Sequence, residues 1–254
     1  MIEALALAGA NVEGALIRRQ DGVALIATGL PLRLFNQVIV DGDGATEAAI
    51  TSAVELARER RDRFVVSLRA GIDDRFIPVT QRLGLVSLSD DPWMPGMAMH
   101  PLPGDRPAAL PGYEIRPATD AAGLEDHIVT CAGGFGMQLD WLRAVMGMPL
   151  LDHPDATVYV GYADDQPVST GFGLRVGRTI GIYNISTLPT ARRHGYGEAM
   201  TMRIVADGLA RGCDVATLEA SEMGYPIYAR LGFRKVVDYM GYVDPASLAP
   251  APVA

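Results

Sequence analysis

The chain has 254 residues, of which 49% are hydrophobic, and its formal net charge is −8. At this length two domains of ordinary size are expected. The acidic balance disfavours a nucleic-acid or anionic-membrane binder, because the averaged field of the protein repels phosphate groups. The two cysteines are too few for a disulfide framework, which indicates a reducing compartment. We therefore expect a cytoplasmic protein.

The first hundred residues combine apolar runs typical of strands with one long amphipathic pattern. The expected elements are strands over 23–30 and 35–41, a helix over 45–63, a strand over 64–70, and a helix followed by a strand over 77–88.

A proline-rich stretch, HPLPGDRPAALPG, follows at residues 100–112. Such a composition holds neither a helix nor a central strand, because proline lacks the backbone N–H. We place the domain boundary there, with domains at 1–108 and 109–254.

The second half predicts a longer series of elements in the order β, α, α, β, β, β, α, β, α, β. They are a strand over 113–118, a helix capped by Thr119 or Asp120 that runs towards Cys131, a helix over 139–146, three strands of an antiparallel meander over 157–163, 167–176 and 179–188, a helix from Tyr196, a strand over 215–221, a helix over 225–232 and a strand over 235–243.

The first half repeats this order in a shortened form. The stretch TQRLGLV (80–86) also shares Arg-Leu-Gly with YARLGFR (228–234). The two halves therefore predict a duplicated unit. The expected fold is α/β (α+β), with each unit built on a mixed, mostly antiparallel sheet flanked by helices, and with the N-terminal unit shortened.

The segment ARRHGYGEAM, residues 191–200, lies between a predicted strand and a predicted helix. Glycines at 195 and 197 let the backbone approach a ligand closely, and the N–H groups at a helix start favour anions. Arg192, Arg193 and His194 add positive donors. The pattern predicts a phosphate site, although an ordinary surface turn with solvated arginines would have the same letters.

Residues 113–243 resemble a GNAT-superfamily acyltransferase domain, in which acyl-coenzyme A binds at a strand, loop and helix carrying V-x-P-x-x-R-x-x-G-x-G. The corresponding stretch is TLPTARRHGYG, with Thr187 at the valine position, Pro189 at the proline, Arg192 at the arginine, and Gly195 and Gly197 at the glycines.

A second family signature, Y-x-x-x-G-F, is present as YARLGF, with Tyr228, Gly232 and Phe233. The first half is similar to the degenerate units of tandem GNAT proteins. Thr80 stands there in place of the tyrosine, and GDGATEAA stands where the phosphate loop would be. We expect no coenzyme in that half.

The resemblance implies roles for individual residues. Tyr228 would protonate or hydrogen-bond the leaving thiolate. The backbone of YNISTL would pair with the pantetheine amides, and the N–H near Ile185 would polarise the thioester carbonyl. Ser221 stands where many relatives have an asparagine that contacts the coenzyme. The implied coenzyme-binding residues are Ile185, Thr187, Arg192, Arg193, His194, Gly195, Tyr196, Gly197 and Ser221.

A general base is harder to identify from the sequence. Glu219, in the strand TLEAS, is a candidate that would act through a water, and Asn184 would orient the acceptor. The alternatives are that Glu219 faces solvent or pairs with an arginine, and that no dedicated base exists. We expect no metal ion, since the histidines lack the spacing of ligands. His100, His127 and His153 are expected on the surface or in linkers.

The function predicted from these residues is transfer of an acyl group, in the first place acetyl from acetyl-coenzyme A, to a primary amine of a small molecule or peptide. An alternative is a non-catalytic acyl-coenzyme A sensor that binds a partner protein through its N-terminal unit, and O-acyl transfer also stays open. Phe35 and Asn36 are candidates for reaching the acceptor. The internal duplication favours a monomer over a homodimer.

Overall fold

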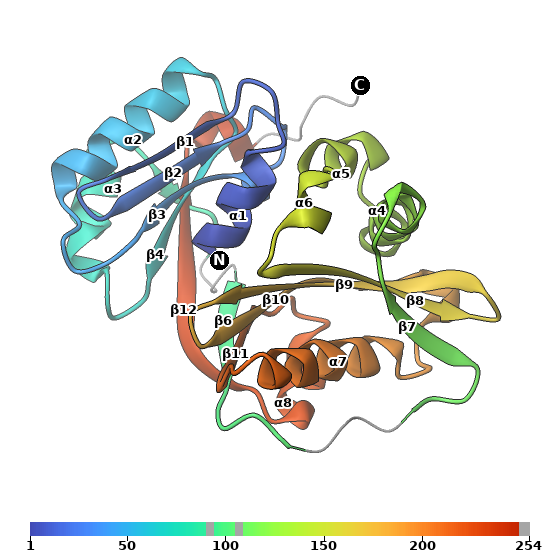
Figure 1. Ribbon diagram of the computed structural model, residues 1–254. Helices are drawn as coiled ribbons and strands as arrows, with labels where there is room; N and C mark the ends of the chain where they lie inside the picture. The colour runs from blue at the N-terminus through green and yellow to red at the C-terminus, as the bar shows by residue number, and fades with distance from the viewer. Residues whose placement is uncertain (90–93, 105–108, 249–254) are drawn as a thin grey trace. The chain divides into compact units, whose positions relative to one another are not determined.

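The computed structural model describes residues 1–89, 94–104 and 109–248 (Figure 1). The chain divides into two compact units, the first made of Met1–Pro95 and Val237–Ala254 and the second of Gly96–Val236. These limits differ from the expected 1–108 and 109–254. Two strands account for the difference. Strand β6 (Met94–Met99) pairs with the strand Val215–Glu219 of the second unit, and the last strand, β12 (Arg234–Val243), begins in the second unit and ends by pairing with a strand of the first. Part of the expected boundary, 105–108, lies outside the described residues.

The first unit contains a mixed sheet. In it β1 and β2 pair antiparallel, β2 and β3 pair antiparallel, and β3 and β4 pair in parallel, while the end of β12 pairs antiparallel with β4 and β5. Its elements are α1 (Ile2–Gly9), β1 (Leu16–Gln20), β2 (Val23–Ala27), β3 (Asn36–Val40), α2 (Glu47–Glu59), β4 (Val65–Arg69), α3 (Ile77–Arg82) and β5 (Val86–Ser87), with short 3₁₀ turns at Arg33–Phe35, Asp74–Phe76 and Pro245–Leu248.

Both faces of this sheet are covered, which explains why β2 is a continuous apolar run. Its five residues are all buried. Val23 and Leu25 pack with the apolar face of α2, whereas Ala24 and Ile26 pack with the start of α1. Alternate side chains of a strand point to opposite faces, so a strand enclosed on both sides needs apolar residues at every position.

The second unit is larger and also contains a mixed sheet, with strand order β6-β11-β10-β9-β8-β7. Its strands are β6 (Met94–Met99), β7 (Tyr113–Pro117), β8 (Ala156–Ala163), β9 (Gln166–Val176), β10 (Thr179–Thr187) and β11 (Val215–Glu219). Its helices are α4 (Ala121–Phe135), α5 (Leu139–Val145), α6 (Pro149–Asp152), α7 (Tyr196–Ala210) and α8 (Tyr225–Leu231), with a 3₁₀ turn at Pro189–Ala191.

Helices also cover both faces of the strands in the second unit. Within this unit α4 packs on β8, β9 and β10, while α7 packs against β9 and β10 from the opposite face (Figure 1). Ile180 and Ile182 of β10 join Met200 and Ile204 of α7 in one buried cluster. The amphipathic spacing of α7 therefore positions its N-terminus beside the end of β10.

The two units repeat one local arrangement. In each, a three-stranded antiparallel meander leads into a helix and then into a strand parallel to the last meander strand: β3, α2 and β4 in the first unit, and β10, α7 and β11 in the second. The shared Arg-Leu-Gly ends a helix in the same way in both. Gly84 and Gly232 have positive φ, and the next residue donates its N–H to the carbonyl of Thr80 or Tyr228 at 3.0 Å.

The structure confirms the expected fold class and, apart from the additional short helix α6, the element order of the second half. Helices α1 and α6 and strands β1 and β6 were not predicted, because they are short and lack clear periodicity.

Two residues, His127 and Asn36, were placed wrongly from the sequence. His127 lies fully buried in α4 rather than on the surface. Phe35 and Asn36 are buried inside the first unit, where the Asn36 side chain accepts from the Thr28 N–H at 2.8 Å. The Asn36 amide also donates to the Leu30 carbonyl at 2.6 Å, so its side chain is occupied within the first unit, whereas a role for Phe35 stays a prediction.

Candidate functional site

The strands β10 and β11 separate part of the way along their length. They pair in parallel only from Thr179 to Gly181, opposite Val215 to Thr217. Beyond Gly181, no strand in the described part of the chain pairs with the β11-facing edge of β10. The backbone N–H and C=O groups on that edge, including those near Ile185, are therefore available to a ligand that carries amides of its own.

A bulge marks the same stretch of β10 on its other side. The register with β9 shifts between Tyr183 and Ser186, and Asn184 has a φ of 53°. Thr170 donates its hydroxyl to the Asn184 carbonyl at 2.8 Å, which holds the bulge in place. A bulge bends its strand and increases the local twist. It therefore contributes to the separation of β10 from β11.

The N-terminus of α7 follows directly after this strand. Gly195 is the N-cap, with a φ of 82° that favours glycine, and no side chain caps the helix. Within the described ranges, no group accepts a hydrogen bond from the N–H of Tyr196, Gly197 or Glu198. These donors lie at the positive end of a helix of 15 residues, which is the arrangement that an anion site would need.

The end of β10 and the first turn of α7 adjoin. A Cβ built on Gly197 would lie 3.7 Å from the Thr187 hydroxyl and 3.9 Å from the Ile185 side chain. Three of the candidate binding positions thus come together, and a ligand that follows the free edge of β10 reaches the open N–H groups of α7.

The basic residues of the loop have different roles. Arg192 is half-buried and donates to the carbonyls of Thr187, at 3.3 Å, and Gly134, at 2.8 Å. It therefore ties the end of α4 to the end of β10. Arg193 and His194 are exposed, and the His194 ring stacks on Tyr196 at 5.5 Å between centroids.

The close approach of α4 to β10 depends on Gly134. A Cβ at this position would overlap the Ser186 hydroxyl and lie 3.2 Å from the Thr187 backbone nitrogen. Sequence reasoning did not identify Gly134 as part of the site. The signal that could have identified it is the Gly-Gly pair at 133–134 inside a predicted helix. A glycine there costs roughly 1 kcal/mol of helix stability relative to alanine, which indicates that close packing requires it.

Tyr228 lies on α8 and is 9% exposed. Its ring packs edge-on against Phe233, with 6.0 Å between the centroids. Burial raises the pKa of Tyr228 to about 12, so the phenol keeps its proton at neutral pH. Among the described residues no hydrogen-bond partner occupies its hydroxyl.

Helix α8 is held beside the first turn of α7. Glu198 of α7 pairs with Arg230 of α8 at 2.5 Å. Ser221 precedes α8 and accepts the Gly224 N–H with its hydroxyl at 3.1 Å. The Ser221 side chain thus stabilises the start of α8, and its hydroxyl proton is still free to donate to a ligand.

Glu219 is the last residue of β11, beyond the point where β11 leaves β10. Burial raises the pKa of its carboxyl above the ordinary value. A carboxylate with a raised pKa is a better proton acceptor than a solvated one, which suits it to general base work. In the described ranges, no three or more His, Cys, Asp or Glu side chains gather as metal ligands do.

In the first unit, the start of α2 corresponds to the start of α7, but a side chain caps it. The hydroxyl of Thr46 caps α2 by accepting the Ala49 N–H at 3.1 Å, and Glu47 adds a negative charge to the first turn. In the preceding loop, Asp41 donates its N–H to the Gly22 carbonyl at 2.7 Å. These contacts leave fewer free donors for an anion than the second unit has at α7.

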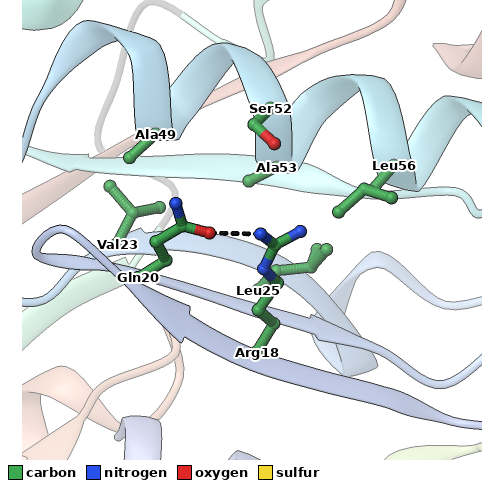
Figure 2. A pocket seen from close by; sticks show the side chains of 8 residues that line it. All are labelled: Arg18, Gln20, Val23, Leu25, Ala49, Ser52, Ala53 and Leu56. Carbon is green, nitrogen blue, oxygen red and sulfur yellow. Dashed lines mark hydrogen bonds between the residues drawn. The ribbon is translucent and has the colours of Figure 1, made fainter.

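The first unit has a small hollow between β1, β2 and α2, shown in Figure 2. Arg18 and Gln20 lie at one side of it and are joined by a hydrogen bond, while Ala49 and Ala53 face them from α2. Its volume is about 10 Å³, which holds one water at most. It is too small for a substrate.

Comparison with known families agrees with this geometry. Residues 111–225 match the family described as acetyltransferase (GNAT) domain. This part of the chain is similar to a GNAT domain, and the match supports acyl-coenzyme A-dependent acyl transfer in general. A comparison with curated proteins finds no match.

Solved structures similar to the whole chain share its fold. A GCN5-related N-acetyltransferase from Kribbella flavida is 16% identical, with a TM-score of 0.71 over 96% of this chain and 94% of that one. A tandem GNAT protein from the clavulanic acid biosynthesis pathway is 14% identical, with a TM-score of 0.66 over 98% and 88%. A GCN5-related N-acetyltransferase from Sphaerobacter thermophilus is 16% identical, with a TM-score of 0.61 over 91% and 82%.

No helix in the described part of the chain is long and apolar enough to cross a bilayer.

Proposed function

We propose that the chain transfers an acetyl group from acetyl-coenzyme A to a primary amine of a small molecule or peptide. The observation that carries the proposal is the uncapped start of α7 at the point where β10 has left β11. The free edge of β10 suits the amides of the pantetheine arm. The N–H groups of α7, with Arg193 and His194 beside them, suit the diphosphate.

The reaction joins the amine nitrogen to the thioester carbonyl carbon and breaks the carbon–sulfur bond. The backbone N–H near Ile185 polarises the carbonyl and stabilises the oxyanion that develops on it. Tyr228, kept protonated by its raised pKa, donates to the departing thiolate. Glu219 accepts the proton that the amine loses, through a water, while Asn184 orients the acceptor from the bulge.

Arg192 acts in this scheme mainly through position. Its hydrogen bonds to Gly134 and Thr187 set the loop and the end of β10, and the remaining guanidinium donors are available to the diphosphate. Ser221 similarly holds the start of α8 and offers one hydroxyl proton to the coenzyme.

The test uses an isosteric pair at Gly197. This position has space for a side chain, and an aspartate in the first turn also favours the helix, so the variant is expected to fold. Gly197→Asp places a negative charge where the diphosphate would bind, and Gly197→Asn is its neutral control.

We expect the Asp variant to bind coenzyme A at least about tenfold more weakly than the Asn variant, about 1.4 kcal/mol by calorimetry. Pantetheine, which has no diphosphate, should bind both variants equally. Equal coenzyme A affinities of the Asp and Asn variants would show that the diphosphate does not bind at the N-terminus of α7. Acetyl transfer itself is tested by thiol release from acetyl-coenzyme A with a panel of amines, and the absence of release with every amine would contradict the proposed activity.

A further inference from the structure

A second hollow of the GNAT-containing unit has the size of a ligand site. Its volume is about 390 Å³, within the range of roughly 300–1,000 Å³ that small-molecule pockets occupy. Its walls come from the segments 98–103 and 231–236, both of which belong to the second unit.

The walls are apolar, with a cation at one side. The side chains that give the hollow this character are Met99, Leu102, Leu231 and Val236, together with His100 and Arg234. None of the described residues that line it is acidic. Val236 is 63% exposed, so one wall presents apolar surface to solvent. A ligand would gain free energy by covering that surface.

Arg234 differs from its neighbouring arginines in having no anionic partner. Arg178 pairs with Asp214 at 2.7 Å and Arg230 pairs with Glu198 at 2.5 Å, whereas no described carboxylate forms an ion pair with Arg234. In a chain with a net charge of −8, an exposed arginine without a carboxylate partner is a local site of positive potential.

His100 has a fixed orientation. Its Nδ1 lies 2.9 Å from the Asp214 carbonyl oxygen, to which the Nδ1–H donates. The imidazole is thereby held at the edge of the hollow as a flat, partly apolar wall.

The hollow is separate from the proposed transfer site. Met99 is paired with Ala216 on β11, whereas Glu219 is paired with Gly96. At roughly 3.3 Å per residue these positions lie about 10 Å apart along the strand. Leu231 is the last residue of α8 and Arg234 is the first residue of β12, while the proposed coenzyme residue Ser221 precedes the start of α8.

We propose that this hollow binds a small organic carboxylate with an apolar body. The guanidinium of Arg234 pairs with the carboxylate, and Met99, Leu102 and Leu231 contact the apolar part. Arginine suits this role because its planar group donates two parallel hydrogen bonds to one carboxylate. Leu231 belongs to the helix that carries Tyr228, so the bound molecule contacts the same helix as the proposed transfer chemistry.

Calorimetry with the full chain tests the proposal, with 4-phenylbutyrate as the probe and 4-phenylbutan-1-ol as its uncharged counterpart. We expect saturable binding of the carboxylate, and binding at least about tenfold weaker for the alcohol. Arg234→Gln should weaken carboxylate binding by at least about tenfold, and Arg234→Glu should abolish it. Lys235→Gln is the matched control, because Lys235 is the adjacent cation but does not line the hollow. The affinity of the Lys235→Gln variant for 4-phenylbutyrate should stay within about twofold of that of the original chain.

Three results would overturn the proposal. One is no saturable binding of the carboxylate up to about 10 mM. Another is unchanged affinity in both Arg234 variants, with thermal unfolding used to confirm that they are folded. The third is displacement of the carboxylate by saturating coenzyme A, because that would place it in the transfer site instead.

Discussion

The buried His127 is expected to make the stability of the second unit depend on pH. Its Nδ1 lies 2.9 Å from the Tyr159 carbonyl oxygen, so Nδ1–H donates, while its Nε2 is buried and has no partner among the described residues. Burial lowers the pKa of His127 to about 4. A proton on Nε2 would place an unpaired charge in the core between α4 and the sheet.

The size of the pH-dependent change in the free energy of unfolding follows from the pKa values of His127 in the unfolded and folded chain. The unfolded chain takes up this proton near pH 6.5 and the folded chain only near about pH 4. Between these values the unfolded state binds more protons than the folded state. The contribution of His127 to the free energy of unfolding is therefore present above about pH 6.5 and is lost as the pH falls towards 4. The whole difference is about 3 kcal/mol, and about 2 kcal/mol of it is lost between pH 7.5 and pH 5.

Urea unfolding at these two pH values measures the effect. Trp141 reports on α5, which packs on α4, and a Trp93→Phe background makes it the only tryptophan. His127→Asn keeps a donor near the Nδ1 position but does not titrate. We expect this variant to lose about 2 kcal/mol less than the original chain between pH 7.5 and pH 5.

The half-buried His153 provides the control, since His153→Asn should keep the full pH dependence. If His127→Asn loses as much stability as the original chain over this range, then His127 is not the source, and the reasoning from its burial is wrong.

Three further predictions concern the proposed site. Tyr228→Phe should lower turnover by at least about tenfold, because the proton donor is lost. The affinity for acetyl-coenzyme A, measured by calorimetry, should stay within about twofold. Unchanged thiol release would show that Tyr228 has only a packing role. Gly134→Ala should cost about 1–3 kcal/mol in urea unfolding and weaken coenzyme A binding, because its methyl group overlaps the Ser186 hydroxyl. The control, Gly133→Ala, meets only one flexible side-chain end and should cost less. Glu219→Gln should lower kcat and remove the acidic limb of its pH profile, and an unaltered profile would argue against Glu219 as the base.

Much of the fold could be predicted because its signals are local. The meander from β8 to β10 follows from alternating strands joined by short turns, and α7 follows from apolar residues at helical spacing. The glycine at position 195 is explained by its backbone conformation, because a φ of 82° is strained for other residues. The expected phosphate loop coincides with an uncapped helix start.

Other features depend on residues far apart in the chain. No local pattern indicated that β12 would begin in one unit and end in the other, because the partners of a strand are determined by packing and not by its own residues. The hydrogen bond from Arg192 to Gly134 joins residues 58 positions apart. No local pattern could have assigned the arginine to that carbonyl.

Turn chemistry and periodicity act over a few residues, so most of the element order, the repeated local arrangement of the two halves and the position of the glycine-rich loop could be predicted from the residues alone. Three features became visible only in the folded chain: β10 leaves β11 after Gly181, His127 is enclosed, and Arg234 lies beside an apolar hollow. Each of these depends on which distant segments come to lie beside one another, and that is determined by packing of the whole chain.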